Sequence, residues 1–358
     1  MRAESFLELN VVHTAAPNLE ISIMSPTTVF SADVLKIDAA AVSADIESKI
    51  RDIVLRRLNR KGVIVAISGG IDSSVVAALC SKAMGTERVL GLMLPEADSS
   101  PDSLHFANLL AQSLGLRTHV EDISGILTAA GCYERRDEAI RKVIPEYQAG
   151  YKCKLVLPDQ VNGNVYPIFS VVVESPRGER TKVRLTLDSY LGVVAATNFK
   201  QRTRKMMECY YADLSNYAVA GTPNRLEYDQ GFFVKNGDGA ADLKPIAHLY
   251  KTQVYALAEY LGIPQEIQNR APTTDTYSLD QSQGEFYFPL PYDRMDLCLY
   301  AKNHGLLPEE VAHVVGLTAK QVARVYHVID ATRSATRYLH RAPVLCEEVP
   351  EVLDDVRD

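Results

Sequence analysis

A heptad rich in glycine and serine, SGGIDSS at residues 68–74, is the first feature that could perform chemistry. It follows the apolar run 63–67 and precedes the helix-like segment 75–84, so we expect it at a strand-to-helix junction. The first backbone N–H groups of a helix have no partners within that helix, and the helix dipole adds partial positive charge there. The heptad therefore predicts a phosphate-binding loop.

The side chains of the heptad fit this prediction. Gly69 and Gly70 would let the backbone approach an anion closely, and Asp72 could hold a magnesium ion that bridges phosphate groups. Because the heptad lacks the lysine of a Walker A motif, we expect it to hold pyrophosphate and not to transfer a γ-phosphoryl group. The alternative is an ordinary glycine turn with a Ser or Asp helix cap. The hydroxyl donors would be Ser68, Ser73 and Ser74.

Alternating apolar runs and helical patterns surround the heptad. Helical spacing at 46–58 precedes it, and strand-like runs at 88–94 and 116–123 flank a helical pattern at 103–115. Repeated strand–helix units with continuous apolar strands are typical of a parallel sheet that is covered on both faces. We therefore predict an α/β fold with a doubly wound parallel sheet and flanking helices.

A β-rich insertion at about 131–187 interrupts this alternation. Pro176 and Gly178 would form the turn between its last two strands, which predicts a small antiparallel sheet. After it we expect a long helix, a buried strand within 217–224 and a helical C-terminal region. The β-branched runs of the insertion are 154–159, 165–174 and 180–187.

Three parts of the chain are expected from this pattern. An N-terminal extension at 1–35 is punctuated by Pro, Ser and Thr, the nucleotide-binding part spans 36–345, and a C-terminal tail spans 346–358. We expect no independently folding domains within the middle part.

The composition argues against several classes of protein. A formal net charge of -7 and a pI near 5.7 argue against a dedicated nucleic-acid-binding protein. The basic cluster KQRTRK at 200–205 is local and favours a site for small phosphates. Six scattered cysteines without a C-x-x-C pair predict free thiols and no zinc site. Because no leader and no run of eighteen apolar residues is present, we expect a soluble cytoplasmic protein without membrane partners.

A segment near the C-terminus resembles a DNA-binding helix-turn-helix in length. Residues 307–329 have a central glycine and a Thr helix cap. Reading DNA would require several basic side chains on the second helix, and only Lys320 and Arg324 meet this requirement. The favoured interpretation is a pair of helices packed within an enzyme.

The heptad resembles the pyrophosphate loop of the N-type ATP pyrophosphatases, which include NAD, GMP, argininosuccinate and asparagine synthetases. Later segments are similar to the NAD synthetases of the ammonia-dependent type. NFKQRTRKM at 198–206, AGTPNRLE at 220–227 and the long segment 231–264 match their motifs in order, followed by 271–275 and 290–300. The resemblance covers roughly 40–345 outside the insertion. It implies an adenine nucleotide alpha hydrolase-like fold.

The resemblance also implies roles for individual residues. Asp72 and Glu227 would hold Mg²⁺, Lys251 and Thr273 would contact the departing pyrophosphate, and Thr222 would contact ATP. Developing negative charge requires such donors and a metal. The positions that resemble the dinucleotide-binding residues of the family are Asn198, Arg202, Phe232, Lys235, Asp238 and Asp242.

The implied reaction uses ATP and Mg²⁺ to adenylate the carboxylate of deamido-NAD, after which ammonia displaces AMP to give NAD. Ammonia would come from solution or from a separate glutaminase, because no amidase domain precedes the loop. The family also implies a homodimer. The alternatives are a paralogue that amidates another carboxylate and a nucleotide-binding protein without catalytic activity.

Two departures from the family pattern concern the acceptor side. In the run 276–292, Gln281 is kept, but Gln283 and Gly284 stand where the family has an acidic pair, and Glu285 comes one place late. The β insertion replaces a short connection and could reach the substrate. We therefore expect the ATP half of the site to follow the family more closely than the acceptor half.

Overall fold

A four-stranded parallel sheet lies at the centre of the chain. The computed structural model describes residues 30–157, 169–271, 276–281, 287–288, 290–347 and 349. The strand order is β3-β2-β1-β7, and every neighbouring pair is parallel, which confirms the predicted α/β class. The strands are β1 (Val63–Ala66), β2 (Val89–Met93), β3 (Arg117–Val120) and β7 (Ala218–Ala220).

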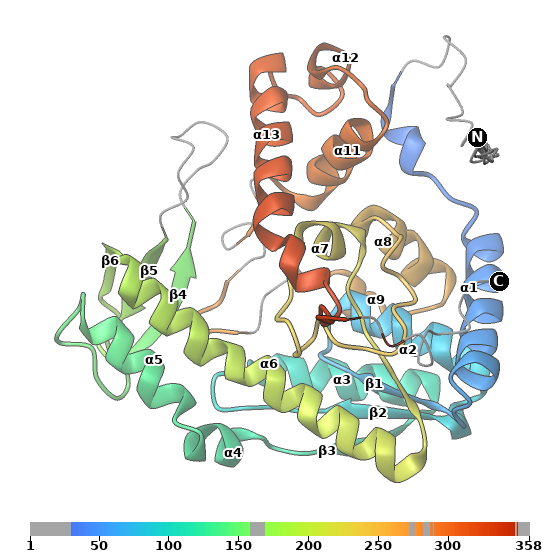
Figure 1. Cartoon of the computed structure of the whole chain (residues 1–358), viewed down its shortest axis with the longest axis horizontal. Helices are drawn as coiled ribbons and strands as arrows, with labels where there is room; N and C mark the ends of the chain where they lie inside the picture. Colours follow the sequence, from blue (N-terminus) through green and yellow to red (C-terminus); the bar gives the residue numbers. More distant parts are fainter. Residues whose placement is uncertain are drawn as a thin grey trace, which may run out of the picture.

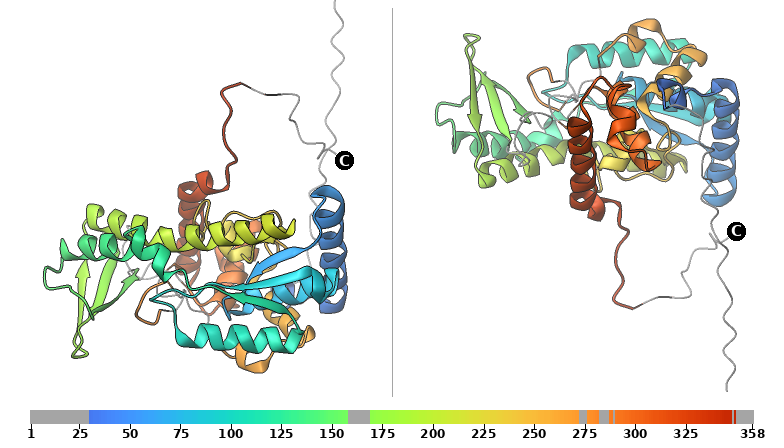
Figure 2. Two further views of the ribbon diagram at one scale, coloured as in Figure 1. Left: turned by 90° about the horizontal axis from the view of Figure 1, so that it is seen from below. Right: turned by 90° about the horizontal axis from the view of Figure 1, so that it is seen from above.

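The apolar sequence of β1 explains why both faces of the sheet are covered. Val63, Ile64 and Val65 have no exposed surface. Because side chains alternate along a strand, Val63 and Val65 join the core beneath α1, α2, α3 and α8, whereas Ile64 packs with α4 and α6. Figure 2 shows α3 and α6 on opposite sides of the sheet. β3 differs from the expectation, since it is an edge strand with exposed residues.

Helices connect and cover these strands (Figure 1). The helix predicted at 46–58 begins earlier, because the side chain of Asp38 caps it by accepting from the N–H of Ala41 at 3.0 Å. It ends in a π-helical turn at Ile53–Arg57. The helices of this part are α1 (Ala39–Asp52), α2 (Ile71–Met84), α3 (Pro101–Leu114), α4 (Ser124–Ala129), α6 (Leu187–Ser215), α7 (Arg225–Gln230), α8 (Lys251–Tyr260) and α9 (Gln265–Gln268), with short 3-10 turns at Ala32–Leu35 and Thr86–Arg88.

The predicted antiparallel sheet is confirmed, and a helix precedes it. α5 (Cys132–Arg141) opens the insertion, and β4 (Lys152–Val156), β5 (Ser170–Glu174) and β6 (Arg180–Arg184) follow. Pro176 and Gly178 lie in the turn between β5 and β6, where Gly178 has a φ of +82°. Buried side chains of β4 and β5 pack against α5 and α6. Figure 1 shows this sheet projecting beside the N-terminal end of α6, away from the parallel sheet.

The C-terminal helices form a second apolar cluster. They are α11 (Tyr292–Asn303), α12 (Pro308–Ala312) and α13 (Ala319–Thr336), followed by a 3-10 turn at Arg337–His340. Val311, Val322 and Ile329 are fully buried between these helices. The segment that resembles a helix-turn-helix therefore serves to pack α12 and α13 together, as the favoured interpretation expects.

Two sequence expectations concern the chain as a whole. All six cysteines are described, and each is a free thiol. In the described ranges, no helix has the length and apolar character needed to cross a membrane.

Candidate active site

The predicted phosphate loop lies between the carboxyl end of β1 and α2. Gly70 is the N-cap residue of α2, and the hydroxyls of Ser73 and Ser74 donate to its carbonyl oxygen at 3.0 and 2.8 Å. The N–H of Gly70 donates to Ser68 Oγ, and the N–H of Ser68 donates to Ser73 Oγ, both at 3.3 Å. These bonds fix the direction of the first turn of α2, whose N–H groups and positive dipole end suit an anion.

Only glycine fits at position 69. Gly69 has a φ of +76°, and a Cβ there would lie 2.5 Å from the carbonyl oxygen of Ser103. Arg270 bridges the same two segments, since its guanidinium donates to the carbonyl of Gly69 at 3.3 Å and to Ser103 Oγ at 2.9 Å. Arg270 thus holds the loop against α3.

Asp72 meets the loop that follows β7. Its Oδ1 accepts a hydrogen bond from Asn224 Nδ2 at 3.1 Å, and its Oδ2 forms an ion pair with Lys251 Nζ. β7 and β2 lie on opposite sides of β1, so the carboxyl ends of β1 and β7 frame a topological switch point. Open parallel sheets bind their ligands at such points.

Asn224 links the two predicted metal ligands. Its Oδ1 accepts from the N–H groups of Leu226 and Glu227 at 3.0 and 3.1 Å, while Glu227 Oε2 accepts from the N–H of Asn224 at 3.1 Å. This capping box starts α7 and orients Glu227 relative to Asp72. Sequence analysis assigned no role to Asn224, although an Asn three residues before a Glu is the spacing of such a box.

Lys251 is a buried cation at the start of α8, with 2% of its surface exposed. Burial lowers the pKa of a lysine, but the carboxylates of Asp72 and Glu227 outweigh it, so the pKa of Lys251 is raised above its usual value. Lys251 therefore keeps its proton in the neutral range and supplies a positive charge.

Asp296 of α11 is a second residue that sequence analysis missed. Its Oδ2 accepts from the N–H and the Oγ1 of Thr252 at 2.8 and 3.0 Å, which ties the first turn of α8 to α11. Burial raises the pKa of Asp296 to about 6, against the opposing effect of these bonds and of Lys251. Its position directly behind Lys251 indicates that it helps to place this lysine.

A cavity of about 450 Å³ connects most of the predicted site residues. Gly69 and Ser74 are both buried and are not part of the cavity lining. The size is in the range of small-molecule sites. The predicted residues that line the cavity are Ser68, Gly70, Asp72, Ser73, Asn198, Thr222, Glu227, Phe232, Asp238 and Lys251.

Three predicted substrate-binding residues make other contacts and, among the described residues, are not part of the cavity lining. Asp242 Oδ2 accepts from the N–H of Val219 at 2.7 Å, which anchors β7. Lys235 donates to two backbone carbonyls in 338–341, at 2.8 and 3.2 Å. Arg202 donates to the carbonyl of Lys235 at 3.3 Å. Their assignment to the substrate stays a prediction.

One predicted pyrophosphate contact and three positions on the acceptor side lie outside the described residues. They are Thr273, Gln283, Gly284 and Glu285. Gln281 is described and buried, and its side-chain amide donates to the carbonyl oxygen of Leu155 in β4.

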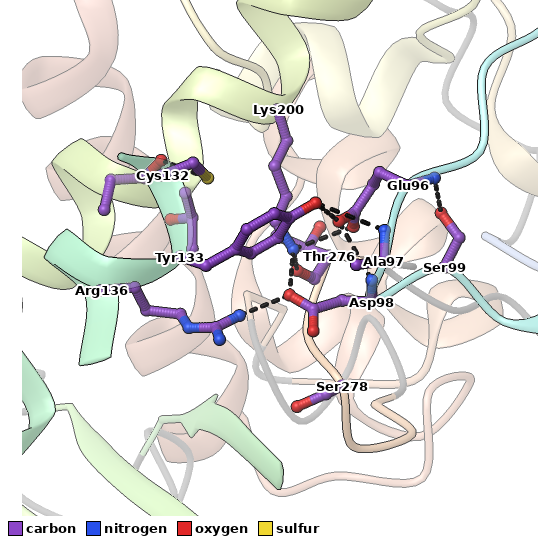
Figure 3. Close-up of polar contacts among 12 residues, drawn as sticks. Glu96, Ala97, Asp98, Ser99, Cys132, Tyr133, Arg136, Lys200, Thr276 and Ser278 are labelled. Carbon is purple, nitrogen blue, oxygen red and sulfur yellow. Dashed lines mark hydrogen bonds and ion pairs between the residues drawn. The ribbon is translucent and has the colours of Figure 1, made fainter. Parts of the chain in front are cut away.

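Lys200 of α6 lies in a buried ion cluster beside the cavity (Figure 3). Its Nζ is 2.9 Å from Glu96 Oε1 and 2.6 Å from Asp98 Oδ2, and it donates to the carbonyl of Thr276 at 2.7 Å. Arg136 of α5 forms the second ion pair of Asp98. Burial raises the pKa of Asp98, but Lys200 and Arg136 outweigh it and lower this pKa. Arg136 also pairs with Asp137 at 2.9 Å, so two cations face three carboxylates in this cluster.

The prediction of a phosphate site at 200–205 is wrong for Lys200, because its charge is neutralised inside this cluster. Arg204 and Lys205 do line the cavity. Arg204 donates to the carbonyl of Leu94 at 3.3 Å, and Lys205 Nζ pairs with Glu208 Oε2 at 2.5 Å. The basic stretch therefore divides among separate roles.

Comparisons with known proteins show the family of this chain. A family model described as NAD synthase matches residues 42–145 and 179–337. The NH(3)-dependent NAD(+) synthetase of Rhizobium meliloti is 56% identical over 324 residues, covering 90% of this chain and 97% of that protein. The same enzyme of Mesorhizobium japonicum is 56% identical over 317 residues, covering 88% and 99%.

The fold is also shared with a solved structure. The NH3-dependent NAD synthetase from Campylobacter jejuni in complex with the nitrate ion is 22% identical, with a TM-score of 0.56, over 87% of this chain and 100% of that chain. The family model covers well over half of the present chain, with its one internal gap at 146–178 within the insertion. This chain belongs to the NAD synthase family.

Proposed function

We propose that this chain catalyses the ATP-dependent amidation of deamido-NAD by free ammonia. The observation that carries the proposal is the meeting of Asp72, Glu227 and Lys251, from three separate segments, at the wall of one cavity beside the 68–74 loop. Curated relatives that share more than half of their residues with nearly the whole chain are named for this activity.

The reaction would proceed in two displacements. The carboxylate of deamido-NAD attacks the α-phosphorus of ATP, the bond to the β-phosphate oxygen breaks, and pyrophosphate leaves. Ammonia then attacks the acyl carbon of the adenylate, AMP leaves with the electrons of the C–O bond, and loss of one proton gives the amide of NAD. The site contributes by positioning the reactants and by balancing charge, so no covalent intermediate on the protein is needed.

The residues of the site are suited to positioning the reactants and balancing their charge. The first turn of α2 and the hydroxyls of the loop would hold the pyrophosphate portion of ATP. Lys251 carries a buried positive charge that would stabilise the negative charge developing on the departing pyrophosphate. Asn224 keeps Asp72 and Glu227 in fixed relative positions.

Magnesium fits the donors of this site. Asp72 and Glu227 both line the cavity, and Mg²⁺ is usually held by one or two carboxylates together with substrate phosphates. Each carboxylate oxygen accepts up to two bonds, so the contacts of Asp72 leave capacity for a metal. Over the described ranges, no group of three or more His, Cys, Asp or Glu could hold a metal alone, so phosphate oxygens would complete the coordination. Bound Mg²⁺ would neutralise phosphate charge.

Steady-state assays test the proposal. Purified protein with ATP, Mg²⁺, ammonium and deamido-NAD should form AMP, pyrophosphate and NAD in equal amounts. A panel of other acids tests the paralogue alternative, which would be correct if another carboxylate gave the higher kcat/KM. If no carboxylate with ammonia released pyrophosphate, the chain would be a nucleotide-binding protein and the proposal would be wrong.

We also propose a homodimer. Large apolar side chains at four-residue spacing stand exposed on α6, and each such set lies along one side of the helix. Exposed apolar surface of this kind marks an interaction site. The exposed residues are Leu187, Leu191, Met206, Tyr210 and Leu214.

We make three further proposals. A cytoplasmic location is supported by six free thiols, which a reducing compartment preserves. Ammonia would come from solution or from a separate glutaminase. The division into an extension at 1–35, a catalytic part at 36–345 and a tail at 346–358 follows the sequence pattern.

A further inference from the structure

Two stacked aromatic pairs line the cavity. Phe169, immediately before β5, stacks on Tyr190 of α6 with ring centroids 4.5 Å apart and planes at 17°. Phe232 stacks on Tyr287 at 4.5 Å and 30°. Burial and then the nearby Tyr190 raise the pKa of Tyr287, so the two pairs lie within electrostatic range of each other. All four rings line the cavity, and we call them the aromatic slot.

The slot is connected to the charged part of the site through Phe232. The N–H of Phe232 donates to the carbonyl oxygen of Glu227 at 2.9 Å, and Glu227 interacts electrostatically with Lys251. A carboxylate that reacts with ATP must come close to these charges. The ring that carries this carboxylate must therefore lie beside them, and the slot offers the stacked aromatic surface for it.

The wall formed by Phe169 comes from outside the family pattern. Phe169 lies in 146–178, between the two parts that match the NAD synthase family model. The neighbouring strand β4 is bonded to the segment 276–281, where the N–H of Cys153 donates to Ser278 Oγ at 3.0 Å. The insertion is thus fixed against a segment of the cavity wall.

The ring of Phe169 lies between the core of the insertion and the cavity. In this core, Leu155, Val171 and Val173 are almost completely buried. Phe169 and Tyr190 pack against the core, are only partly buried and also line the cavity. The side of the pair that lines the cavity can contact a ligand.

We propose that Phe169 and Tyr190 form one wall of the binding site for the carboxylate-bearing aromatic ring of the acceptor, with Phe232 and Tyr287 as the other wall. This inference rests on the proposed function. A flat, electron-poor pyridinium ring gains from offset stacking on phenyl and phenol rings, whereas an aliphatic acid does not. The insertion then selects acceptors that carry a planar ring.

A single tryptophan tests this placement directly. The chain contains no tryptophan, so F169W introduces one fluorophore into the slot. We expect deamido-NAD and nicotinate mononucleotide to quench its fluorescence saturably, and ATP alone to leave it unchanged. Y151W is the matched control, because Tyr151 lies in the same insertion, packs on Tyr147 and does not line the cavity. Quenching of F169W by ATP alone would assign the slot to adenine and overturn the proposal.

Kinetics provide the second test. F169A should raise the KM for deamido-NAD about threefold to tenfold, the value of one lost aromatic contact, with kcat and the KM for ATP within about twofold. F169Y should restore the KM and F169L should not, whereas Y151A should behave as wild type. An unchanged KM in F169A would overturn the proposal. If wild type makes no NAD, the proposed function itself is wrong; if wild type is active and the Phe169 variants behave as wild type, only this inference fails.

Discussion

Replacing Lys200 by methionine tests whether the buried ion cluster stabilises the fold. Methionine keeps the length and the apolar stem of the side chain but removes its charge. Lys200 has no exposed surface and contacts Glu96 at 2.9 Å and Asp98 at 2.6 Å. Arg136 pairs with Asp98 and Asp137, so in K200M the buried carboxylate of Glu96 loses the cation at its Oε1 and its negative charge is left uncompensated away from water.

The expected loss of stability follows from this imbalance. Removing one partner of a buried ion pair costs about 3–5 kcal/mol, because the remaining charge stays desolvated. Unfolding entropy of about 2.1 cal/mol/K per residue over roughly 300 folded residues is about 0.6 kcal/mol/K, so the unfolding temperature should fall by about 5–8 °C. The matched control is K82M, since Lys82 pairs with Glu47 at 3.3 Å but is 47% exposed. An exposed pair contributes about 0–1 kcal/mol.

Unfolding is followed by circular dichroism at pH 7. Thermal unfolding gives the change in unfolding temperature, and urea unfolding gives the change in the free energy of unfolding. The pH dependence adds a second check. Lys200 and Arg136 lower the pKa of Asp98 in the folded state, so this carboxylate stabilises the fold above its unfolded pKa of about 3.9 and loses the contribution as pH falls further. K200M lacks part of this contribution. The difference in the free energy of unfolding between wild type and K200M should therefore become smaller below about pH 4. A loss in K200M no larger than in K82M would refute the reasoning.

Three further variants test other parts of the structure. Asp72→Asn should reduce pyrophosphate release about 10²- to 10³-fold while circular dichroism shows a folded protein, and an active variant would contradict the metal-ligand assignment. Burial raises the pKa of Asp296 to about 6, so the free energy of unfolding of wild type should fall as pH rises from about 4 to 6. Asp296→Asn should lose less stability over this range. Equal dependence of stability on pH in the two proteins would exclude this effect. Leu214→Glu should convert the proposed dimer to monomer in light scattering, with Leu307→Glu as control, since Leu214 and Leu307 are 70% and 61% exposed; a monomeric wild type would rule the dimer out.

The position of the 68–74 loop at a strand-to-helix junction could be predicted because its determinants are local. Seven consecutive residues form the 68–74 loop, and the strand before it and the helix after it are visible from hydrophobic spacing. Gly69 is required by its positive φ and its close approach to α3, which only a glycine permits. The loop after β7 meets this one because β1 and β7 are neighbours in the sheet, and that follows once the fold is a doubly wound sheet.

Lys200 shows why other roles could not be predicted. It appears in a basic stretch with Arg204 and Lys205 in α6. Lys205 points about 140° away from Lys200 around the helix, whereas Arg204 lies on nearly the same face but one turn further along, so these side chains meet different surroundings. The carboxylates that neutralise Lys200, Glu96 and Asp98, lie about one hundred residues earlier in the chain. No local pattern reveals such a pairing. For the same reason, the sequence could not show that Asp242 and Lys235 bond to backbone groups and do not line the cavity.

The insertion and the segment 276–281 pack on each other, although they are more than one hundred residues apart in the sequence. The side chain of Gln281 donates to the carbonyl of Leu155, and Lys154 Nζ donates to the carbonyl of Asp280 at 2.9 Å, so β4 and 276–281 support each other. The position of the segment 276–281 therefore depends on the insertion. Because Phe169 from the same insertion lines the cavity, the insertion reaches the same cavity as the 68–74 loop.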